Sequence, residues 1–227
     1  MALNKQKGNM YPWITHTWNP VRGTCEHDCS YCYMKRMPNL GDMRLDEKAL
    51  GDQLGFDGKS IFVGSSTDMF SKSVPVEWIE DVLEKCCTFW VNDYTFQTKN
   101  PSRFLELTDK IPPRCTLGVT IESDIDYGIS LAPSPKTRAH DLAMTKGFAN
   151  ADRFVSIEPV MDFTHGFVDI LNDISPTFVS IGADSGRNGL KEPKEEQVLD
   201  LIDRLYCFTE VRIKDNLKRI CPSIGRG

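Results

Sequence analysis

Short apolar runs rich in β-branched and aromatic residues recur along this chain, separated by segments with a helical period. In chain order the runs are WITHTW, SIFVGSS, YTFQTK, TLGVTIE, RFVSIE, TFVSIG and EVRIK. Strands that alternate with helices are typical of βα units around a parallel sheet, so we predict an α/β fold with parallel strands. A closed eight-stranded barrel typically needs about 250 residues. The pattern therefore favours an incomplete barrel, and by itself it also permits an open sheet.

Apolar residues repeat at the i, i+3, i+4 and i+7 spacing in two segments, which predicts one buried face on each of two helices. The two sets are Val198, Leu201, Ile202 and Leu205, and Phe167, Ile170, Leu171 and Ile174. A third helix is predicted from about Pro75 to Trp90, with proline in its first turn. Asn100 and Pro101 open a fourth.

The composition of the chain is that of an ordinary globular protein. Its 227 residues are 40% hydrophobic and 26% charged, without a linker or a low-complexity segment, so we predict a single domain over residues 1–227, with a C-terminal extension from about 207 to 227. No apolar run resembles a signal peptide or approaches the roughly 18 residues of a membrane span, which favours a cytoplasmic protein. A formal net charge of -5 argues against a generally basic nucleic-acid-binding surface.

Three cysteines, Cys25, Cys29 and Cys32, lie in one loop of residues 23–34 with the spacing C-x3-C-x2-C. Iron-sulfur cubanes normally take four thiolates, so a loop with three leaves one iron open to an exchangeable ligand. Structural zinc would need a fourth ligand, and His27 between two of the cysteines is sterically poor for that role. A remote fourth ligand keeps the zinc alternative open. The other five cysteines are expected to be structural.

The cysteine spacing, together with the aromatic residue Tyr31 before the last cysteine, resembles the signature of the radical S-adenosylmethionine superfamily. The resemblance implies a partial (β/α)6 TIM-like barrel, a 4Fe-4S cluster on the three cysteines, and S-adenosylmethionine bound to the open iron. It also implies that one electron cleaves the cofactor to a 5'-deoxyadenosyl radical, which removes a hydrogen atom from a substrate. An electron donor such as flavodoxin or ferredoxin is implied as a partner.

Polar residues follow nearly every predicted strand. They are Ser65, Ser66, Thr67 and Asp68 after the second run, Thr98 and Lys99, Glu122 and Ser123, Glu158, Asp184 and Ser185, and Lys214. In barrels of parallel strands the active site lies at the carboxyl ends, so these side chains are expected to converge at one mouth. Any single one of them could instead cap a helix or stabilise a turn.

The chemistry of each polar group suggests which part of the cofactor or substrate it could bind. Ser65, Ser66 and Asp68 could accept hydrogen bonds from the methionine ammonium of the cofactor, although VGSSTD departs from the Gly-Gly-Glu segment common in the superfamily. The ribose hydroxyls could be bound by Glu122, Ser123 or Glu158, and Tyr31 would lie along the adenine. Lys99 and Lys214 suit a carboxylate or phosphate. The candidate catalytic residues are Lys99, Glu158 and Lys214.

Further strings extend the resemblance from Thr17 to about Gly186. They are TWNPVRG, IFVGSSTDMF, FQTKNPSRF, LGVTIE, RFVSIEP and SIGADSG, and they resemble a largely uncharacterised radical S-adenosylmethionine family of bacteriophage and bacterial genomes. The YCY string also resembles the cysteine loop of spore photoproduct lyase, which repairs a thymine photodimer in DNA. These likenesses favour a nucleic-acid base or nucleoside as substrate. The alternatives are a zinc-stabilised, non-catalytic nucleic-acid-binding module and a barrel enzyme acting on a phosphorylated metabolite.

Overall fold

The computed structural model describes residues 3–148 and 151–224, so both ends of the expected domain, including the last residues of the C-terminal extension, lie outside the described residues. A single eight-stranded sheet organises the chain, with strands in the order β1-β2-β5-β6-β7-β8-β9-β10. The strands are β1 (Leu3–Lys5), β2 (His16–Trp18), β5 (Ser60–Val63), β6 (Asp93–Thr98), β7 (Cys115–Thr120), β8 (Ala151–Ile157), β9 (Phe178–Ile181) and β10 (Glu210–Ile213). All neighbours pair in parallel except β1 with β2.

The α/β class and the parallel strands predicted from the sequence are confirmed. Each of the seven apolar runs overlaps one of the seven parallel strands, and these strands lie side by side in chain order, which is the winding of a βα barrel. In the described part of the chain β1 and β10 are the sheet edges, and no pairing between them closes the sheet.

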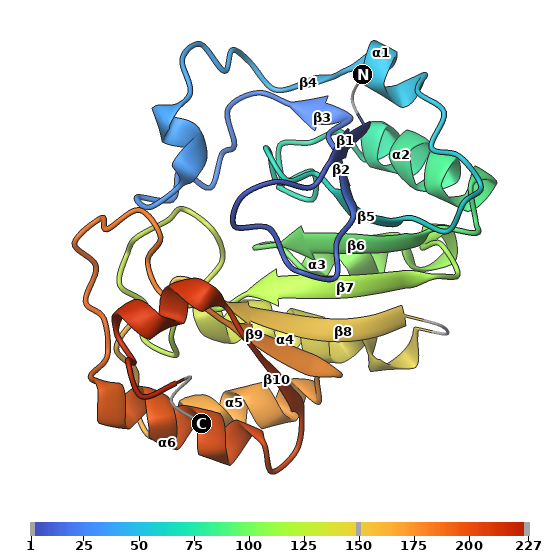
Figure 1. Ribbon diagram of the computed structural model, residues 1–227. Helices are drawn as coiled ribbons and strands as arrows, with labels where there is room; N and C mark the ends of the chain where they lie inside the picture. The colour runs from blue at the N-terminus through green and yellow to red at the C-terminus, as the bar shows by residue number, and fades with distance from the viewer. Residues whose placement is uncertain (1–2, 149–150, 225–227) are drawn as a thin grey trace.

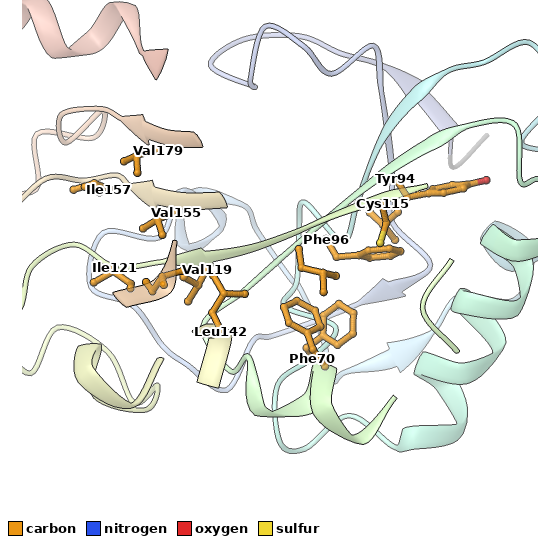
Figure 2. Packing of buried hydrophobic residues seen from close by; sticks show 14 of the residues in the cluster. Phe70, Tyr94, Phe96, Cys115, Val119, Ile121, Leu142, Val155, Ile157 and Val179 are labelled. Carbon is orange, nitrogen blue, oxygen red and sulfur yellow. The ribbon is translucent and has the colours of Figure 1, made fainter. Parts of the chain in front are cut away.

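Helices cover one face of the sheet (Figure 1). They are α1 (Glu47–Leu50), α2 (Val76–Thr88), α3 (Ser102–Glu106), α4 (Pro135–Ala143), α5 (Phe167–Ile174) and α6 (Glu195–Leu205), with four 3-10 turns at η1 (Tyr33–Arg36), η2 (Thr108–Lys110), η3 (Met144–Gly147) and η4 (Asp215–Arg219). The main core lies between helices and sheet, where Val119, Val155 and Val179 from three adjacent strands pack near Leu142 of α4 (Figure 2). None of the helices in the described ranges is long and apolar enough to cross a membrane.

Sequence reasoning missed three short strands and two helices. These are β1, the pair β3 (Val21–Arg22) and β4 (Arg44–Leu45), and the helices α1 and α4. The run WITHTW was also predicted as a strand from Trp13, whereas β2 begins at His16. The reason is that Trp13 and Ile14 leave the strand and pack against the sheet face opposite the helices.

That opposite face is layered from one end of the strands to the other. Phe62, Phe154 and Phe178 pack against Tyr11 and Trp13 of the N-terminal segment, which crosses the face in Figure 1. The hydroxyl of Tyr11 donates to Gln97 at 2.8 Å and contacts Ser156 at 2.8 Å, forming a neutral polar layer above the rings. Beyond this layer come the charged residues at the carboxyl ends, so polarity rises toward the predicted mouth.

Candidate active site

The cysteine loop is fixed at the carboxyl ends of the strands by three contacts. The His27 ring contacts Asp68 at 2.9 Å between Nε2 and Oδ2, and both side chains are buried. On the other side of the loop, the Ser30 N–H donates to the carbonyl of Ile129 at 2.8 Å, and the Leu131 N–H donates to the carbonyl of His27 at 2.7 Å. The loop therefore has a defined position even though it contains little regular structure.

Asp68 connects the cysteine loop to the end of β6. Its Oδ2 accepts from the Thr98 hydroxyl at 2.8 Å and from the Lys99 N–H at 2.8 Å, in addition to its contact with His27. Its Oδ1 accepts from the Phe70 N–H at 3.0 Å. Although burial opposes ionisation, the hydrogen bond with His27 lowers the pKa of Asp68 below its ordinary value. The ionised carboxylate of Asp68 thus links the His27 ring to the backbone of Lys99 and fixes their relative position.

The three thiols differ in their exposure to solvent. Cys29 is buried, whereas Cys25 and Cys32 are half-buried. Burial raises the pKa of Cys25 to about 11 and also raises the pKa of Cys29, which the ammonium of Lys99 opposes. Among the described residues, no three His, Cys, Asp or Glu side chains converge on a single metal ion. The fit of the loop to a cluster therefore depends on its donor set, three soft thiol ligands above buried cations.

A buried group of four side chains, which we call the Lys99 network, lies against the cysteine loop. The Lys99 ammonium contacts the Tyr31 hydroxyl and the Glu122 carboxylate, and the Tyr31 hydroxyl donates to the same carboxylate. The Arg138 guanidinium binds the other oxygen of Glu122 at 2.9 Å. With two cations and one carboxylate, the network has a surplus of one positive charge. An iron-sulfur cluster on three thiolates is anionic, so this surplus suits it.

The pKa of Glu122 is strongly lowered within the network. Its side chain is only 3% exposed, and burial alone would raise its pKa. The nearby charges of Lys99 and Arg138 outweigh burial and lower the pKa of Glu122 to about 2. The carboxylate is therefore ionised at neutral pH and is oriented by two cations.

Arg138 is a member of the site that sequence reasoning missed. It lies on α4, whose first turn is capped by the Ser134 hydroxyl and carries Pro135 at its start. A single buried arginine leaves no periodic pattern, since arginines on helices are usually exposed. The Ser-Pro pair is the signal that could have located the helix. Glu122 was predicted at the site from the sequence, but its pairing with Arg138 could not be.

A second polar group, which we call the Lys214 network, lies at the ends of β8, β9 and β10. The Lys214 ammonium binds Glu158 at 2.7 Å and the carbonyl of Asn9 at 2.6 Å. The other oxygen of Glu158 accepts from the amides of Asn216 at 2.8 Å and Asn9 at 3.0 Å, and both amides also donate to the Ser185 hydroxyl. One ammonium and one carboxylate make this network neutral, and Asn9 and Ser185 are exposed.

The predicted catalytic residues are thus divided between the two networks. Lys99 belongs to one, and Glu158 and Lys214 belong to the other. The ammonium of each lysine is paired with a carboxylate. Asn9 and Asn216, which complete the Lys214 network, carried no recognisable sequence signal.

The predicted serines mostly contact neighbouring loops of the protein. Ser65 donates to the Asn19 side chain at 3.1 Å, and the Ser66 N–H donates to the same oxygen at 3.0 Å. Ser123 donates to the carbonyl of Asp162 at 2.7 Å and accepts from the Ile125 N–H at 3.0 Å, which stabilises the turn after β7. Ser66 is half-buried.

The short helix η1 spans the mouth from one side to the other. The Tyr33 hydroxyl donates to the carbonyl of Ser65 at 2.6 Å, and Arg36 donates to the carbonyl of Gly186 at 3.0 Å. Ser65 follows β5 and Gly186 follows β9, so η1 links loops on opposite sides of the mouth. An added side chain at position 186 would come closest to the Asn188 amide and would lie 2.7 Å from Arg36, so both of these flexible side chains would have to shift. In Figure 1, η1 is the blue helix beside the loops at the strand ends.

The fold is similar to solved structures of spore photoproduct lyase at very low sequence identity. A mutant of that enzyme with bound AdoMet and dinucleoside spore photoproduct has a TM-score of 0.53 and 11% identity, and the match covers 90% of this chain and 64% of that chain. A mutant with dinucleoside spore photoproduct has a TM-score of 0.61 and 9% identity, covering 92% of this chain and 78% of that chain. At such identities the likeness concerns the fold alone.

Sequence comparison assigns the chain to a family. No curated protein sequence matches it. The profile of a family described as "Protein of unknown function (DUF5131)" matches residues 9–204. This range contains the cysteine loop, the whole Lys99 network, and Asn9, Glu158 and Ser185 of the Lys214 network. Because the match covers most of the sequence, the chain belongs to the DUF5131 family.

Proposed function

We propose that this protein is a radical S-adenosylmethionine enzyme whose substrate is a nucleic-acid base or nucleoside. The observation that carries the proposal is the cysteine loop itself. Three thiols lie on one braced loop at the carboxyl ends of parallel strands, above a buried network with a positive surplus. The fold likeness to spore photoproduct lyase supports the same conclusion.

Cys25, Cys29 and Cys32 would hold a 4Fe-4S cluster. When bound, the cluster and S-adenosylmethionine would supply a 5'-deoxyadenosyl radical that removes a hydrogen atom from the substrate. The residues of this chain would bind and orient the cluster, the cofactor and the substrate. The Lys99 network compensates the negative charge of the thiolates, and the contact between His27 and Asp68 fixes the loop before the metal is loaded.

The cofactor would lie over the ends of β5, β6 and β7. We assign the methionine ammonium to the hydroxyls of Ser65 and Ser66 and to Oδ1 of Asp68, which accepts from one N–H only and retains a lone pair. Glu122 and Ser123 are assigned to the ribose. Tyr31, whose hydroxyl donates to Glu122, is assigned to the adenine.

The substrate would bind on the other side of the mouth, against the Lys214 network. This network is neutral and offers amide, hydroxyl and carboxylate groups, which match the mixed donors and acceptors of a nucleobase edge. A phosphorylated metabolite would instead favour unpaired cations, and Lys99 and Lys214 are both paired with glutamates. Spore photoproduct lyase with its bound dinucleoside provides the precedent for this substrate class, here thymidine modification or repair.

The decisive experiment is a cofactor cleavage assay. The protein is purified without oxygen, reconstituted with iron and sulfide, and incubated with dithionite and S-adenosylmethionine. We expect the wild type to form 5'-deoxyadenosine and Cys29→Ala to form none, because the cluster loses a ligand. Cys207→Ala is the matched control, since Cys207 is an exposed cysteine outside the loop.

Two results would contradict the proposal. The first is stoichiometric zinc and no cluster in the wild type, which would favour the zinc-stabilised binding module. The second is equal 5'-deoxyadenosine formation by Cys29→Ala.

The substrate is then tested by mass spectrometry of oligothymidylate after incubation with the active enzyme, with oligodeoxycytidylate as the comparison. Asp68→Asn and Glu122→Gln, measured as cluster-loaded proteins, are expected to bind S-adenosylmethionine more weakly than the wild type.

A further inference from the structure

Two arginines lie at the same point of the rim of the mouth, beside the Lys214 network. Arg36 of η1 donates from Nη2 to the carbonyl of Gly186 at 3.0 Å. Arg187 follows Gly186 in the chain, so the Cα atoms of these two residues lie about 3.8 Å apart. Ser185, which precedes Gly186, belongs to the Lys214 network through its hydroxyl. Both arginine side chains are exposed, and they come from segments 150 residues apart.

The pairing of these two arginines differs from that of the other cations of the mouth. Among the described residues, neither guanidinium has a carboxylate partner. Lys99 and Lys214 are paired with glutamates, and Lys35, next to Arg36, is paired with Asp28 at 2.6 Å. Arg36 uses one of its five N–H donors for the Gly186 carbonyl. The other donors of both guanidiniums therefore remain for a ligand.

The carboxylates in the loop after β9 have partners other than these arginines. Asp184 accepts from the N–H of Gly186 at 3.0 Å and from the N–H of Asn188. Glu192 binds Arg219 through both of its oxygens, one of them at 2.8 Å. The acidic residues of this loop are thus bound within the loop and to η4.

Arg187 also has an unfavourable backbone conformation. Its φ is 51°, in the left-handed region that glycine adopts without strain and a bulky residue does not. The other non-glycine residues with a positive φ in the described ranges have short side chains; they are Asp28, Asn39 and Ser175. Strain that persists at a long cationic side chain indicates a function for that side chain.

We propose that Arg36 and Arg187 bind a phosphate group attached to the sugar of the substrate, so that the substrate is a nucleotide unit rather than a free nucleoside. The inference rests on the proposed function, which places the base against the neutral Lys214 network. A guanidinium matches phosphate with two parallel hydrogen bonds.

The arrangement of the two sites matches the arrangement of charge in a nucleotide. A nucleotide joins a neutral base to an anion through one sugar. Here the neutral network, with Ser185, and the unpaired cation Arg187 are two residues apart, which is at most about 7 Å along the chain. A base bound inside the mouth would therefore carry its phosphate to the rim.

The test measures binding without turnover. The holoenzyme, reconstituted with iron and sulfide, is supplied with S-adenosylmethionine but no reductant, and fluorescence anisotropy gives the Kd of a fluorescein-labelled oligothymidylate. Thymidine, thymidine 5'-monophosphate and the dinucleotide thymidylyl-(3'→5')-thymidine are the unlabelled competitors. The variants are Arg36→Gln and Arg187→Gln. Lys146→Gln is the matched control, because Lys146 is an exposed cation on η3, which precedes the amino end of β8.

We expect each arginine variant to raise the Kd of the oligothymidylate about five- to tenfold, and Lys146→Gln to leave it unchanged. The slope of log K against log salt should become shallower by about 0.7 in each arginine variant, as expected for one lost phosphate contact to a single strand. The inhibition constant of thymidine should be the same in all proteins, because thymidine has no phosphate.

The two other competitors identify the source of the phosphate. If both arginine variants bind the monophosphate more weakly than the wild type does, the site takes a terminal phosphate. If the weakening is confined to the dinucleotide, the site takes the phosphodiester of a strand.

Arg187→Gly separates binding from folding. It should weaken oligothymidylate binding as much as Arg187→Gln, yet its unfolding temperature should not fall below that of the wild type, because glycine adopts the left-handed conformation without strain. A lower unfolding temperature would show that Arg187 is structural.

Three results would overturn the phosphate site alone. They are an unchanged Kd in both arginine variants, an equal weakening of thymidine binding, and the lower unfolding temperature of Arg187→Gly. A wild type that forms no cluster, or that binds neither thymidine nor oligothymidylate, is a different result. It would overturn the proposed function, and the phosphate site with it.

Discussion

The Lys99 network and the Lys214 network use the same lysine-glutamate pair in two different settings. The Lys99 pair has side chains 10% and 3% exposed, and Arg138 adds a second buried cation. The Lys214 pair has side chains 8% and 16% exposed, and its further partners are neutral amides and a hydroxyl, two of them exposed. The comparison suggests that the first pair is fixed by a second buried cation, whereas the second pair is surrounded by neutral, partly exposed groups that leave it more open to a ligand.

The sharpest test of this difference removes each carboxylate in turn. Glu122→Ala should lower the free energy of unfolding by about 3 to 5 kcal/mol, because it leaves two buried cations without a counterion. Glu158→Ala should cost about 1 to 2 kcal/mol, because solvent can reach the remaining partners. Urea denaturation of the metal-free proteins measures both. Equal losses would remove the distinction between the networks.

Acid should affect the Lys99 network in a defined range of pH. The pKa of Glu122 is lowered from 4.5 to about 2, so its stabilising contribution is present above pH 4.5 and is lost as the pH falls toward 2. The shift corresponds to about 3 kcal/mol. Denaturation between pH 6 and pH 2.5 should show this loss in the wild type, and Glu122→Gln should lack it. The same slope in the variant would mean that other carboxylates cause the effect.

A smaller change should disturb the Lys214 network alone. A methyl group at Gly182 would lie 2.9 Å from atoms of Glu158 and Asn216, so Gly182→Ala should cost about 1 to 3 kcal/mol by overpacking. Gly147→Ala is the control, because nothing lies within 4 Å of its added carbon. The iron content after reconstitution should match the wild type in both variants. If iron loading fails in Gly182→Ala, the two networks are not independent.

The smallest effect is expected at the exposed edge of the same network. Asn9→Ala removes hydrogen bonds to Glu158 and Ser185, but water can replace them, so the loss of stability should stay below about 1 kcal/mol. Thermal unfolding measures this change. A loss as large as that of Glu122→Ala would show that Asn9 is structural and would argue against an open binding surface.

The sequence predicted the sheet well because its signals are local. Each parallel strand coincides with an apolar run, and α2, α5 and α6 coincide with helical spacing. The path of the N-terminal segment was harder to predict. Trp13 is a residue type that favours strands, yet its ring packs against Phe178 from β9. That contact depends on residues far apart in the chain, which no local pattern contains.

The candidate site was predicted only in part. The convergence of Lys99, Glu122, Glu158 and Lys214 at the strand ends follows from the parallel winding, which places every carboxyl end at one edge. Which lysine pairs with which glutamate does not follow from the parallel winding. Charge pairing depends on side-chain reach and on burial, and Arg138 reaches Glu122 from a helix whose sequence has no strong apolar period.

The N-terminal segment has a consequence for how the protein is made. The Asn9 carbonyl accepts a hydrogen bond from Lys214, 205 residues further along the chain, and Trp13 packs edge to face with Phe178, so this segment needs partners that are synthesised much later than itself. Contacts of such long sequence separation form slowly. During synthesis the aromatic rings of this segment would remain uncovered until β9 and β10 are available. Nascent chains stalled before Lys214 should therefore be more susceptible to aggregation than the completed protein.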